Sequence, residues 1–291
     1  MTQTFRLDKI GLINRDKKVS FKFNGKSYFG YEGDTLASAL LANGIHLIGR
    51  SFKYHRPRGF FGSGVDEPYA LVQLYRNNET EPNVKATEQE LFEGLEALSV
   101  NCWPNVNFDI GAINNLLKIF LPAGFYYKTF MWPKSFWHKF YEPFIRKAAG
   151  LGVASIKHDQ EKYEHKYEYC DLLIAGSGPS GLASAYSAAK NGARVILAED
   201  KPRFGGSLLT SEINIGNKNG KEWAESILAE LKDMPNVIVK NRSQVFGYYD
   251  HNMLVMSERV SDHLPNTKKY SPRQRLWYIR AKEVVISSGS I

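Results

Sequence analysis

A glycine-rich loop at residues 176–181, with the sequence GSGPSG, carries the clearest chemical signal in the chain. The apolar run from Cys170 to Ala175 comes directly before it and is typical of a buried parallel strand. Gly176 permits a tight turn, Gly178 lets the backbone approach a pyrophosphate, and Gly181 allows the next helix to pack closely against the strand. The spacing therefore predicts an α/β unit of the Rossmann type that binds a dinucleotide.

The residues after the loop supply the context that a short glycine pattern lacks on its own. A helix is predicted from Pro179 to Asn191, with its amide end directed at the phosphates, and a second strand follows from Ala193 to Ala198. Glu199 closes this strand, where a carboxylate can accept hydrogen bonds from the adenosine ribose and would repel a 2′-phosphate. The other interpretation of Glu199 is an ordinary surface acid.

The residues after Glu199 bear on the choice of cofactor. Asp200 adds a second negative charge, and we expect Lys201 to be the only nearby positive charge that offsets the two acids. Because a single ammonium cannot form the bidentate clamp that arginine offers to a phosphate, we expect NAD to bind more tightly than NADP. A turn at Gly205, Gly206 and Ser207 is expected to pass close to the cofactor, although glycine pairs are also common in ordinary turns.

The rest of the C-terminal half continues the α/β pattern. The predicted elements are a helix at residues 220–231 and a parallel strand at residues 237–240. A three-stranded meander follows, which opens at Val245 and continues at residues 253–260 and 275–279. A last buried strand is predicted at residues 283–289. A Rossmann sheet of this type normally completes its last strand with further sequence. We therefore expect the 291 residues to be the leading part of a longer polypeptide.

The N-terminal part predicts a small β-grasp domain over residues 1–100. Alternation from Val19 to Tyr31 around Asn24-Gly25 indicates a β-hairpin. Asp34 or Thr35 can cap a helix with apolar positions at helical spacing, which Gly44 can end. A later strand is predicted at residues 69–75.

Two segments have no assigned element. Residues 49–64, GRSFKYHRPRGFFGSG, form a basic loop that is either solvated or, because of its aromatic residues, packed against a subunit or an anionic cofactor. Residues 101–165 are rich in aromatic residues, and prolines at 104, 122, 133 and 143 prevent one long helix. We interpret this segment as a connector arm lying over neighbouring protein rather than as a membrane anchor, and residues 166–291 as the dinucleotide-binding domain.

Composition excludes several function classes. The net charge is +8, but lysine and arginine are spread along the chain, so nucleic-acid binding is not expected. No apolar stretch is long enough for a membrane span, and no secretion signal opens the chain, which favours a cytoplasmic protein. Two distant cysteines, Cys102 and Cys170, cannot form a four-thiolate cluster. The histidines, among them His55, His138 and His165, lack the clustering of metal ligands or catalytic groups, so we predict neither a metal site nor catalytic residues in this chain.

Long sequence strings add a more specific signal than the glycine loop. These are EGDTLASALL, LANGIHLIGRSFKYHRPRG, LPAGFYYKTFMWP and GSGPSG, at residues 32–41, 41–59, 121–133 and 176–181. Together they make the whole chain resemble the N-terminal part of the alpha subunits of heterotetrameric sarcosine oxidases.

The resemblance implies a complex with beta, gamma and delta subunits that oxidises sarcosine to glycine, yielding formaldehyde or methylenetetrahydrofolate and hydrogen peroxide. FAD, FMN and tetrahydrofolate would belong to the full complex, with none of their sites complete here, so the chain alone would be inactive. NAD would lie in the Rossmann unit, and the contacts implied are Gly176, Gly178, Pro179, Ser180, Gly181, Glu199, Asp200, Lys201, Ser207 and Val245. Related β-grasp modules hold a [2Fe-2S] cluster through cysteines in the loop at 49–64; this loop has none, so we expect a cluster-free domain. The alternative is an independent FAD/NAD(P)-dependent oxidoreductase or a subunit of a related amine or opine dehydrogenase.

Overall fold

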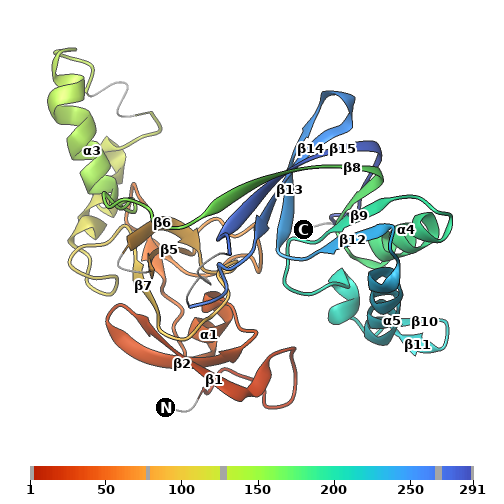
Figure 1. The fold of residues 1–291 in the computed structure, drawn as a ribbon. Helices are drawn as coiled ribbons and strands as arrows, with labels where there is room; N and C mark the ends of the chain where they lie inside the picture. Colours follow the sequence, from red (N-terminus) through yellow and green to blue (C-terminus); the bar gives the residue numbers. More distant parts are fainter. Residues whose placement is uncertain (1–2, 77–78, 125–129, 266–270, 290–291) are drawn as a thin grey trace. The chain divides into compact units, whose positions relative to one another are not determined.

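The computed structural model describes residues 3–76, 79–124, 130–265 and 271–289 (Figure 1). It divides into two compact units: residues 1–160 with 263–265, and residues 161–262 with 266–291. Each unit is described by itself below. Part of the predicted aromatic arm, residues 125–129, lies outside the described residues.

The first unit is built on a five-stranded sheet in the order β2-β1-β7-β5-β6. The strands are β1 Asn14–Phe23, β2 Lys26–Glu32, β5 Leu71–Arg76, β6 Glu79–Lys85 and β7 Leu95–Ser99. β1 and β7 are parallel, whereas the other neighbours are antiparallel. The predicted hairpin is confirmed, with Asn24 and Gly25 both at positive φ in its turn. The strand predicted at 69–75 is shifted to 71–76, and β6 and β7 had no clear signal in the sequence.

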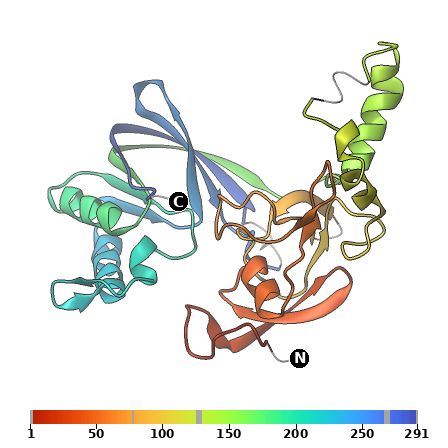
Figure 2. The ribbon, with the colours of Figure 1, turned by 180° about the vertical axis from the view of Figure 1, so that it is seen from behind.

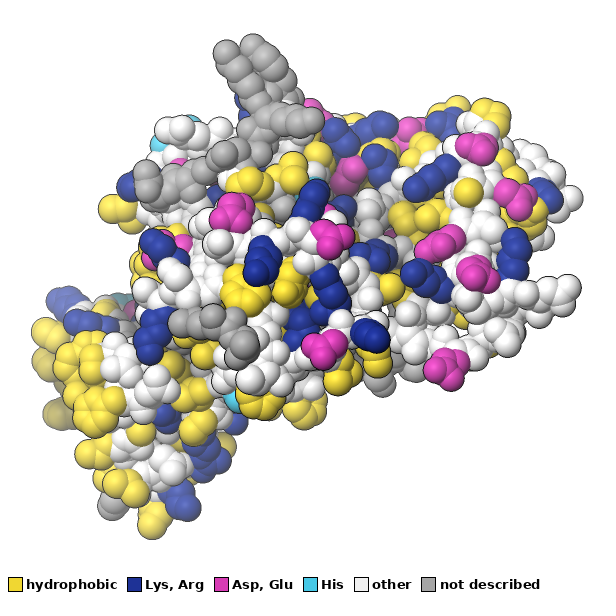
Figure 3. Space-filling model, turned by 90° about the horizontal axis from the view of Figure 1, so that it is seen from below, with side chains coloured by type: hydrophobic (Ala, Val, Ile, Leu, Met, Phe, Trp, Pro, Cys, Tyr) yellow, Lys and Arg dark blue, Asp and Glu magenta, His cyan; other side chains and the backbone are white. Residues whose placement is uncertain are grey.

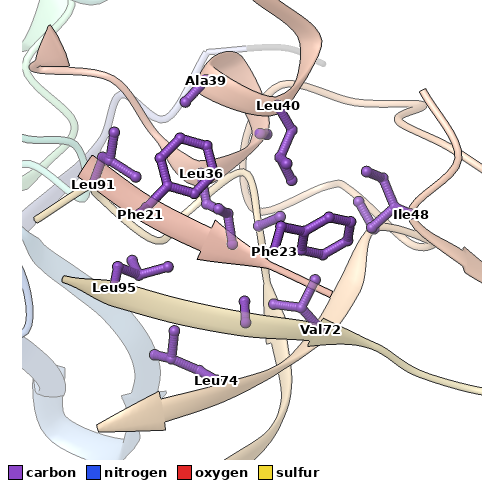
Figure 4. Close-up of a cluster of buried hydrophobic side chains, with 14 of the residues drawn as sticks. Phe21, Phe23, Leu36, Ala39, Leu40, Ile48, Val72, Leu74, Leu91 and Leu95 are labelled. Carbon is purple, nitrogen blue, oxygen red and sulfur yellow. The ribbon is translucent and has the colours of Figure 1, made fainter. Parts of the chain in front are cut away.

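Helix α1, Leu36–Ala42, packs its apolar face against this sheet (Figure 4). Thr35 caps it, because its hydroxyl accepts a hydrogen bond from the Ser38 amide at 3.2 Å, and Gly44 follows its C-terminus at φ +77°. Asp34, the other candidate cap, instead forms an ion pair with Arg6 at 2.7 Å. The core beneath the helix contains Phe21, Phe23, Leu36, Leu40, Ile48, Val72, Leu74 and Leu95.

The connector contains only short helical pieces in its described residues. These are the 3-10 turns η1 Ile110–Asn115 and η2 Lys118–Phe120, the π-turn η3 Trp137–Tyr141, and helix α3 Glu142–Ala149. Pro143 lies in the first turn of α3, where proline is tolerated. The prediction that one long helix does not form is confirmed. Two short strands, β3 Gly49–Arg50 and β4 Pro57–Arg58, pair within the basic loop, and side chains of this loop bind the connector.

The second unit is a six-stranded sheet in the order β12-β9-β8-β15-β14-β13. Its strands are β8 Tyr163–Ala175, β9 Val195–Ala198, β12 Val237–Lys240, β13 Ser243–Tyr249, β14 Met253–Arg259 and β15 Gln274–Ile286. The first four strands in this order are parallel, and the last two form the predicted antiparallel meander with β15. Helices α4, Pro179–Lys190, and α5, Gly220–Asp233, pack on one face, as Figure 2 shows from behind.

The remaining elements of this unit are short. They are η4 Gly206–Leu209, β10 Asn214–Ile215, β11 Lys218–Asn219 and η5 Asp250–Asn252.

The prediction of two separate strands at 275–279 and 283–289 is wrong, because β15 is one continuous strand that ends at Ile286. It pairs with β8 from Gln274 opposite Tyr163 to Ile286 opposite Ala175. β8 is correspondingly longer than the predicted 170–175. Its first half is mostly exposed and polar or aromatic, so it lacks the apolar signature of a buried strand. One strand pair therefore serves both the meander and the parallel sheet.

Candidate functional site

The glycine loop joins the carboxyl end of β8 to α4, and two of its glycines are required by close backbone approach. Gly176 has φ +103°, and a Cβ there would lie 2.4 Å from the Ser287 carbonyl oxygen at the end of β15. A Cβ on Gly181 would lie 2.0 Å from the Gly176 carbonyl oxygen. Both contacts are far inside van der Waals distance. The strand and the helix can therefore approach as the motif predicts only if both residues are glycine.

Gly178 differs, since a Cβ on it would meet nothing within 4 Å. It is the N-cap residue of α4, and no side chain caps this helix. Pro179 follows at the first helical position, and Ser180 is exposed in the first turn. An uncapped helix N-terminus beside open space presents amide donors and the positive end of the helix dipole. This cradle fits a pyrophosphate, and it would be filled by any side chain at Gly178.

Glu199 follows directly after β9, at the tip of the second parallel strand as predicted. It is 6% exposed, so the interpretation as an ordinary surface acid is wrong. One carboxylate oxygen accepts hydrogen bonds from the Ser177 amide at 3.0 Å and the Ser177 hydroxyl at 2.5 Å. The other accepts one from the Lys201 amide at 3.0 Å. Burial and the Asp200 side chain raise the pKa of Glu199, and the Ser177 and Lys201 donors oppose that rise.

The turn at residues 205–207 packs directly on the glycine loop. The Gly205 amide donates to the Ser177 carbonyl at 3.0 Å, and a Cβ on Gly206 would lie 2.9 Å from the Gly178 Cα. Ser207 lies in η4, immediately after this contact. The glycine pair therefore has a packing reason, and contact of Ser207 with a cofactor stays a prediction.

The expectation that Lys201 is the only nearby cation is wrong. The Arg259 guanidinium donates to the Asp200 backbone carbonyl at 2.5 Å. Arg259 is the last residue of β14, almost 60 positions from Asp200 in the sequence. Spacing along the chain therefore gave no indication of this cation.

Val245 lies in β13 and packs, partly buried, against the core cluster on the face of the sheet opposite α4. The start of its strand is held at the site, because the Ser243 amide donates to the Glu199 carbonyl at 2.7 Å. The sequence candidates Gly176, Gly178, Pro179, Ser180, Gly181, Glu199, Asp200, Lys201 and Ser207 thus gather at the carboxyl edge of the parallel strands. Ser177, which links three of these segments, was not singled out by the sequence.

The basic loop of the first unit holds the connector arm. Arg50 donates twice to the Val106 carbonyl, at 3.0 and 2.8 Å, and Lys53 donates to the Pro122 carbonyl at 2.9 Å. The Tyr54 hydroxyl donates to the Leu121 carbonyl at 2.7 Å. These side chains contact the protein's own backbone.

His55 is the buried centre of this loop. Its Nδ1 lies 2.7 Å from an Asp109 carboxylate oxygen, and its Nε2 lies 3.1 Å from the Ala148 carbonyl. It joins the loop, the start of the connector and α3, which agrees with the predicted packing role. His138 and His165 are exposed.

Neither cysteine belongs to a metal-ligating group. Within the described ranges, no cluster of three or more His, Cys, Asp or Glu side chains could hold a metal ion. Burial raises the pKa of the Cys170 thiol to about 12, and burial with the nearby Asp109 raises that of Cys102. The residues of the first unit do not fit a [2Fe-2S] cluster, since the loop at 49–64 has no cysteine and is bonded to the connector. None of the helices in the described residues is both long enough and apolar enough to cross a membrane.

Comparison with known proteins matches both units to families. Residues 16–102 match the family described as "2Fe-2S iron-sulfur cluster binding domain", and residues 171–248 match "FAD dependent oxidoreductase". Among solved structures, L-proline dehydrogenase from P. horikoshii has a TM-score of 0.56 at 20% identity over 96% of this chain and 42% of its own, which indicates a shared fold.

Curated relatives extend the match to almost the whole chain. The sarcosine oxidase alpha chain from Rhizobium meliloti (strain 1021) is 52% identical over 99% of this chain and 29% of its own length. The alpha chain of the enzyme from Corynebacterium sp. (strain U-96) is 30% identical over 96% of this chain and 24% of its own. An opine oxidase subunit from Agrobacterium tumefaciens (strain Ach5) matches 28% of the chain at 33% identity, and 17% of its own length is covered. The chain thus belongs to the sarcosine oxidase alpha-subunit family, and it spans 29% and 24% of the lengths of the two alpha chains.

Proposed function

We propose that the second unit binds an adenine dinucleotide, NAD, within the alpha subunit of a sarcosine-oxidising flavoenzyme complex. The observation that carries this proposal is the cradle formed by the uncapped N-terminus of α4, the open space at Gly178, and the Glu199 carboxylate at the next strand tip. A pyrophosphate at the helix N-terminus and a ribose at the second strand tip are the two fixed points of dinucleotide binding in this fold.

The residues of the site take distinct roles in this proposal. Backbone amides of the loop, with Ser180 at its exposed corner, would bind the pyrophosphate, and Ser207 would approach it from the neighbouring turn. Glu199 would accept hydrogen bonds from the ribose hydroxyls, with Asp200 and Lys201 beside it. Val245 would line the site from β13. When bound, NAD would supply a nicotinamide ring that can accept a hydride.

FAD is the second candidate for this cradle, because residues 171–248 match a family described as FAD-dependent. NAD and FAD share the adenosine diphosphate half, so the loop and Glu199 suit either. The resemblance to sarcosine oxidase alpha subunits favours NAD here, with FAD, FMN and tetrahydrofolate bound elsewhere in the full complex. The first unit is proposed to be a cluster-free β-grasp domain, since its matched region contains one cysteine, Cys102.

The proposed reaction of the whole complex is oxidative demethylation of sarcosine to glycine in the cytoplasm, with beta, gamma and delta subunits. Formaldehyde or methylenetetrahydrofolate and hydrogen peroxide would be the other products. Similarity along 99% of the chain to the alpha chain of a sarcosine oxidase supports this assignment. The isolated 291 residues are expected to be inactive toward sarcosine. An independent FAD/NAD(P)-dependent oxidoreductase, or part of an opine dehydrogenase, is the alternative, to which the short opine oxidase match is relevant.

One purification distinguishes these proposals. The chain is purified without added nucleotide, denatured, and the released cofactor is identified by absorbance and mass spectrometry. NAD in stoichiometric amount, without flavin absorbance near 450 nm and without peroxide release from sarcosine, supports the proposal. Bound FAD with NADH oxidation by the chain alone would establish the independent oxidoreductase instead. Stoichiometric iron and acid-labile sulfide after anaerobic purification would overturn the cluster-free domain.

A further inference from the structure

The connector from residue 101 to residue 156, the arm of the first unit, is fixed to that unit through its backbone. Donors of the basic loop bind its carbonyls at Val106, Leu121, Pro122 and Ala148. Gln73 fixes the end of the arm, because its side chain both donates to the Val153 carbonyl at 3.0 Å and accepts from the Val153 amide at 2.9 Å. The first unit therefore holds the arm largely through the backbone carbonyls of the arm.

Many of those side chains are large, apolar and exposed. Trp132 is 84% exposed, Ile119 81%, Leu116 79%, Phe144 69% and Trp103 67%. Helix α3 buries no side chain among its residues, and Figures 1 and 2 both draw it apart from the strands of its own unit. The exposed rings of Phe136 and Phe140 lie 5.0 Å apart, so part of this apolar surface is contiguous, as is typical of an interaction site.

The arm is also positively charged. Residues 101–156 contain six lysines and arginines and two acids, Asp109 and Glu142. Asp109 is buried against His55, and Glu142 is paired with Arg146 within α3. Lys134, Lys139 and Lys147 are exposed between the aromatic residues. Figure 3 shows hydrophobic side chains lying beside lysine and arginine side chains on one face of the molecule. A complementary surface would be apolar with a rim of carboxylates.

We propose that the arm docks onto an apolar, carboxylate-rimmed surface of a companion subunit. This inference rests on the proposed function, in which the chain is part of an alpha subunit that assembles with other subunits. A lipid surface fits the arm less well, because interfacial binding needs a sustained amphipathic helix. Among the described residues of the arm the longest helical run is Trp137–Ala149, and Trp103, Leu116, Ile119 and Trp132 lie outside it.

The test uses the full alpha chain co-expressed with its companion subunits. Phe140→Glu with Phe144→Glu changes two exposed positions one turn apart, and Lys139→Glu with Lys147→Glu reverses the rim charge. The matched control is Ile213→Glu with Phe246→Glu, which changes two positions exposed to 55% and 56% in the second unit. Circular dichroism verifies that each variant is folded. Assembly is measured by size-exclusion chromatography with light scattering, and affinity by calorimetry.

We expect each arm variant to weaken assembly at least 10-fold, the control to assemble as the wild type does, and the charge reversal to reduce the salt dependence of binding. Arm variants that assemble normally would overturn the docking proposal while leaving the proposed function intact. Protection of the arm from hydrogen exchange in the full alpha chain alone would overturn it in favour of intrachain packing. Flotation with anionic phosphatidylserine vesicles that the arm variants abolish, with unchanged assembly, would assign the arm to a lipid surface. A wild-type alpha chain that assembles with no companion subunit would refute the proposed function itself.

Discussion

The Ser177 hydroxyl lies 2.5 Å from a carboxylate oxygen of Glu199, and the two residues are 0% and 6% exposed. Ser177 occupies the variable position between the first two glycines of the loop. Its amide donates to the same oxygen, and its carbonyl accepts from Gly205. One small residue therefore links the glycine loop, the end of β9 and the turn at residues 205–207. The carboxylate is oriented before any ligand arrives.

Replacing Ser177 with Ala should weaken NAD binding by about 3- to 10-fold at pH 7, as expected for the loss of one hydrogen bond to a charged group, about 1 kcal/mol. The hydroxyl is lost while the amide donor remains, so the loop should stay folded. Calorimetric titration with NAD measures the effect. Ser177→Thr, which keeps the hydroxyl, serves as the rescue variant. Equal affinities of Ala and wild-type proteins would mean that the hydroxyl only fills space.

The pH dependence of binding gives a second, independent measurement. Ribose hydroxyls would donate more strongly to the ionised Glu199 than to its protonated form, and burial raises the pKa of Glu199 above the ordinary value. Affinity should therefore fall as pH falls, beginning at a higher pH than for an ordinary glutamate. Because the Ser177 hydroxyl favours the ionised form, the Ser177→Ala variant should lose affinity at a still higher pH. Binding curves between pH 5 and 8 that coincide for both proteins would separate Glu199 ionisation from NAD binding.

NAD should bind about 10-fold more tightly than NADP. Glu199 and Asp200 alone would give a preference for NAD of about 1–3 kcal/mol, as for polar contacts to a charged group, and the expected preference lies toward the lower end of that range. The reason for the smaller gap is the Arg259 guanidinium beside Asp200, which partly offsets the two carboxylates. Glu199→Ala should narrow the gap chiefly by weakening NAD. Calorimetry of both nucleotides decides this. An unchanged gap in the variant would remove Glu199 from the ribose site.

The local parts of the site could be predicted from sequence because their cause is local. Gly181 is required by a contact with Gly176 within one strand-turn-helix unit, and Glu199 follows directly after the next strand. Arg259 could not be predicted in the same way. Its place beside Asp200 depends on backbone contacts outside the motif, since the Arg259 amide donates to the Arg242 carbonyl and the Arg242 amide donates to the Lys201 carbonyl.

The same distinction explains the errors in the fold. The Asn24-Gly25 hairpin and the Thr35 cap are specified by neighbouring residues and are confirmed. Strand β6 has no regular alternation of buried and exposed residues, so period two gave no signal there. The sequence of the basic loop is compatible with both solvation and packing. Its partners are backbone carbonyls of the connector, and these carry no side-chain signature in the sequence.

Breaking the buried His55–Asp109 contact should destabilise the first unit. The Asp109 carboxylate accepts from His55, the Trp103 amide and the Gly111 amide, and its side chain is 0% exposed. Asp109→Ala leaves these buried donors without their acceptor, and each unsatisfied donor typically costs about 1–3 kcal/mol. Urea unfolding monitored by tryptophan fluorescence measures the change. The exposed Asp16→Ala control should stay within about 0.5 kcal/mol of the wild type. Equal effects of the two substitutions would show that the contact contributes nothing specific.

The glycines of the loop allow ligand binding and folding to be separated by two matched substitutions. A Cβ at Gly178 meets nothing within 4 Å, and its φ of −65° suits any residue, so Gly178→Ala should fold with unchanged or slightly higher stability. The new methyl group would occupy the space of the pyrophosphate, so NAD affinity should fall at least 10-fold, about 1.4 kcal/mol. At Gly181 a Cβ lies 2.0 Å from the Gly176 carbonyl oxygen, so Gly181→Ala should lower the thermal midpoint instead. Differential scanning calorimetry and NAD titration of both variants give the two readouts. Normal NAD affinity in a folded Gly178→Ala protein would place the dinucleotide away from this loop.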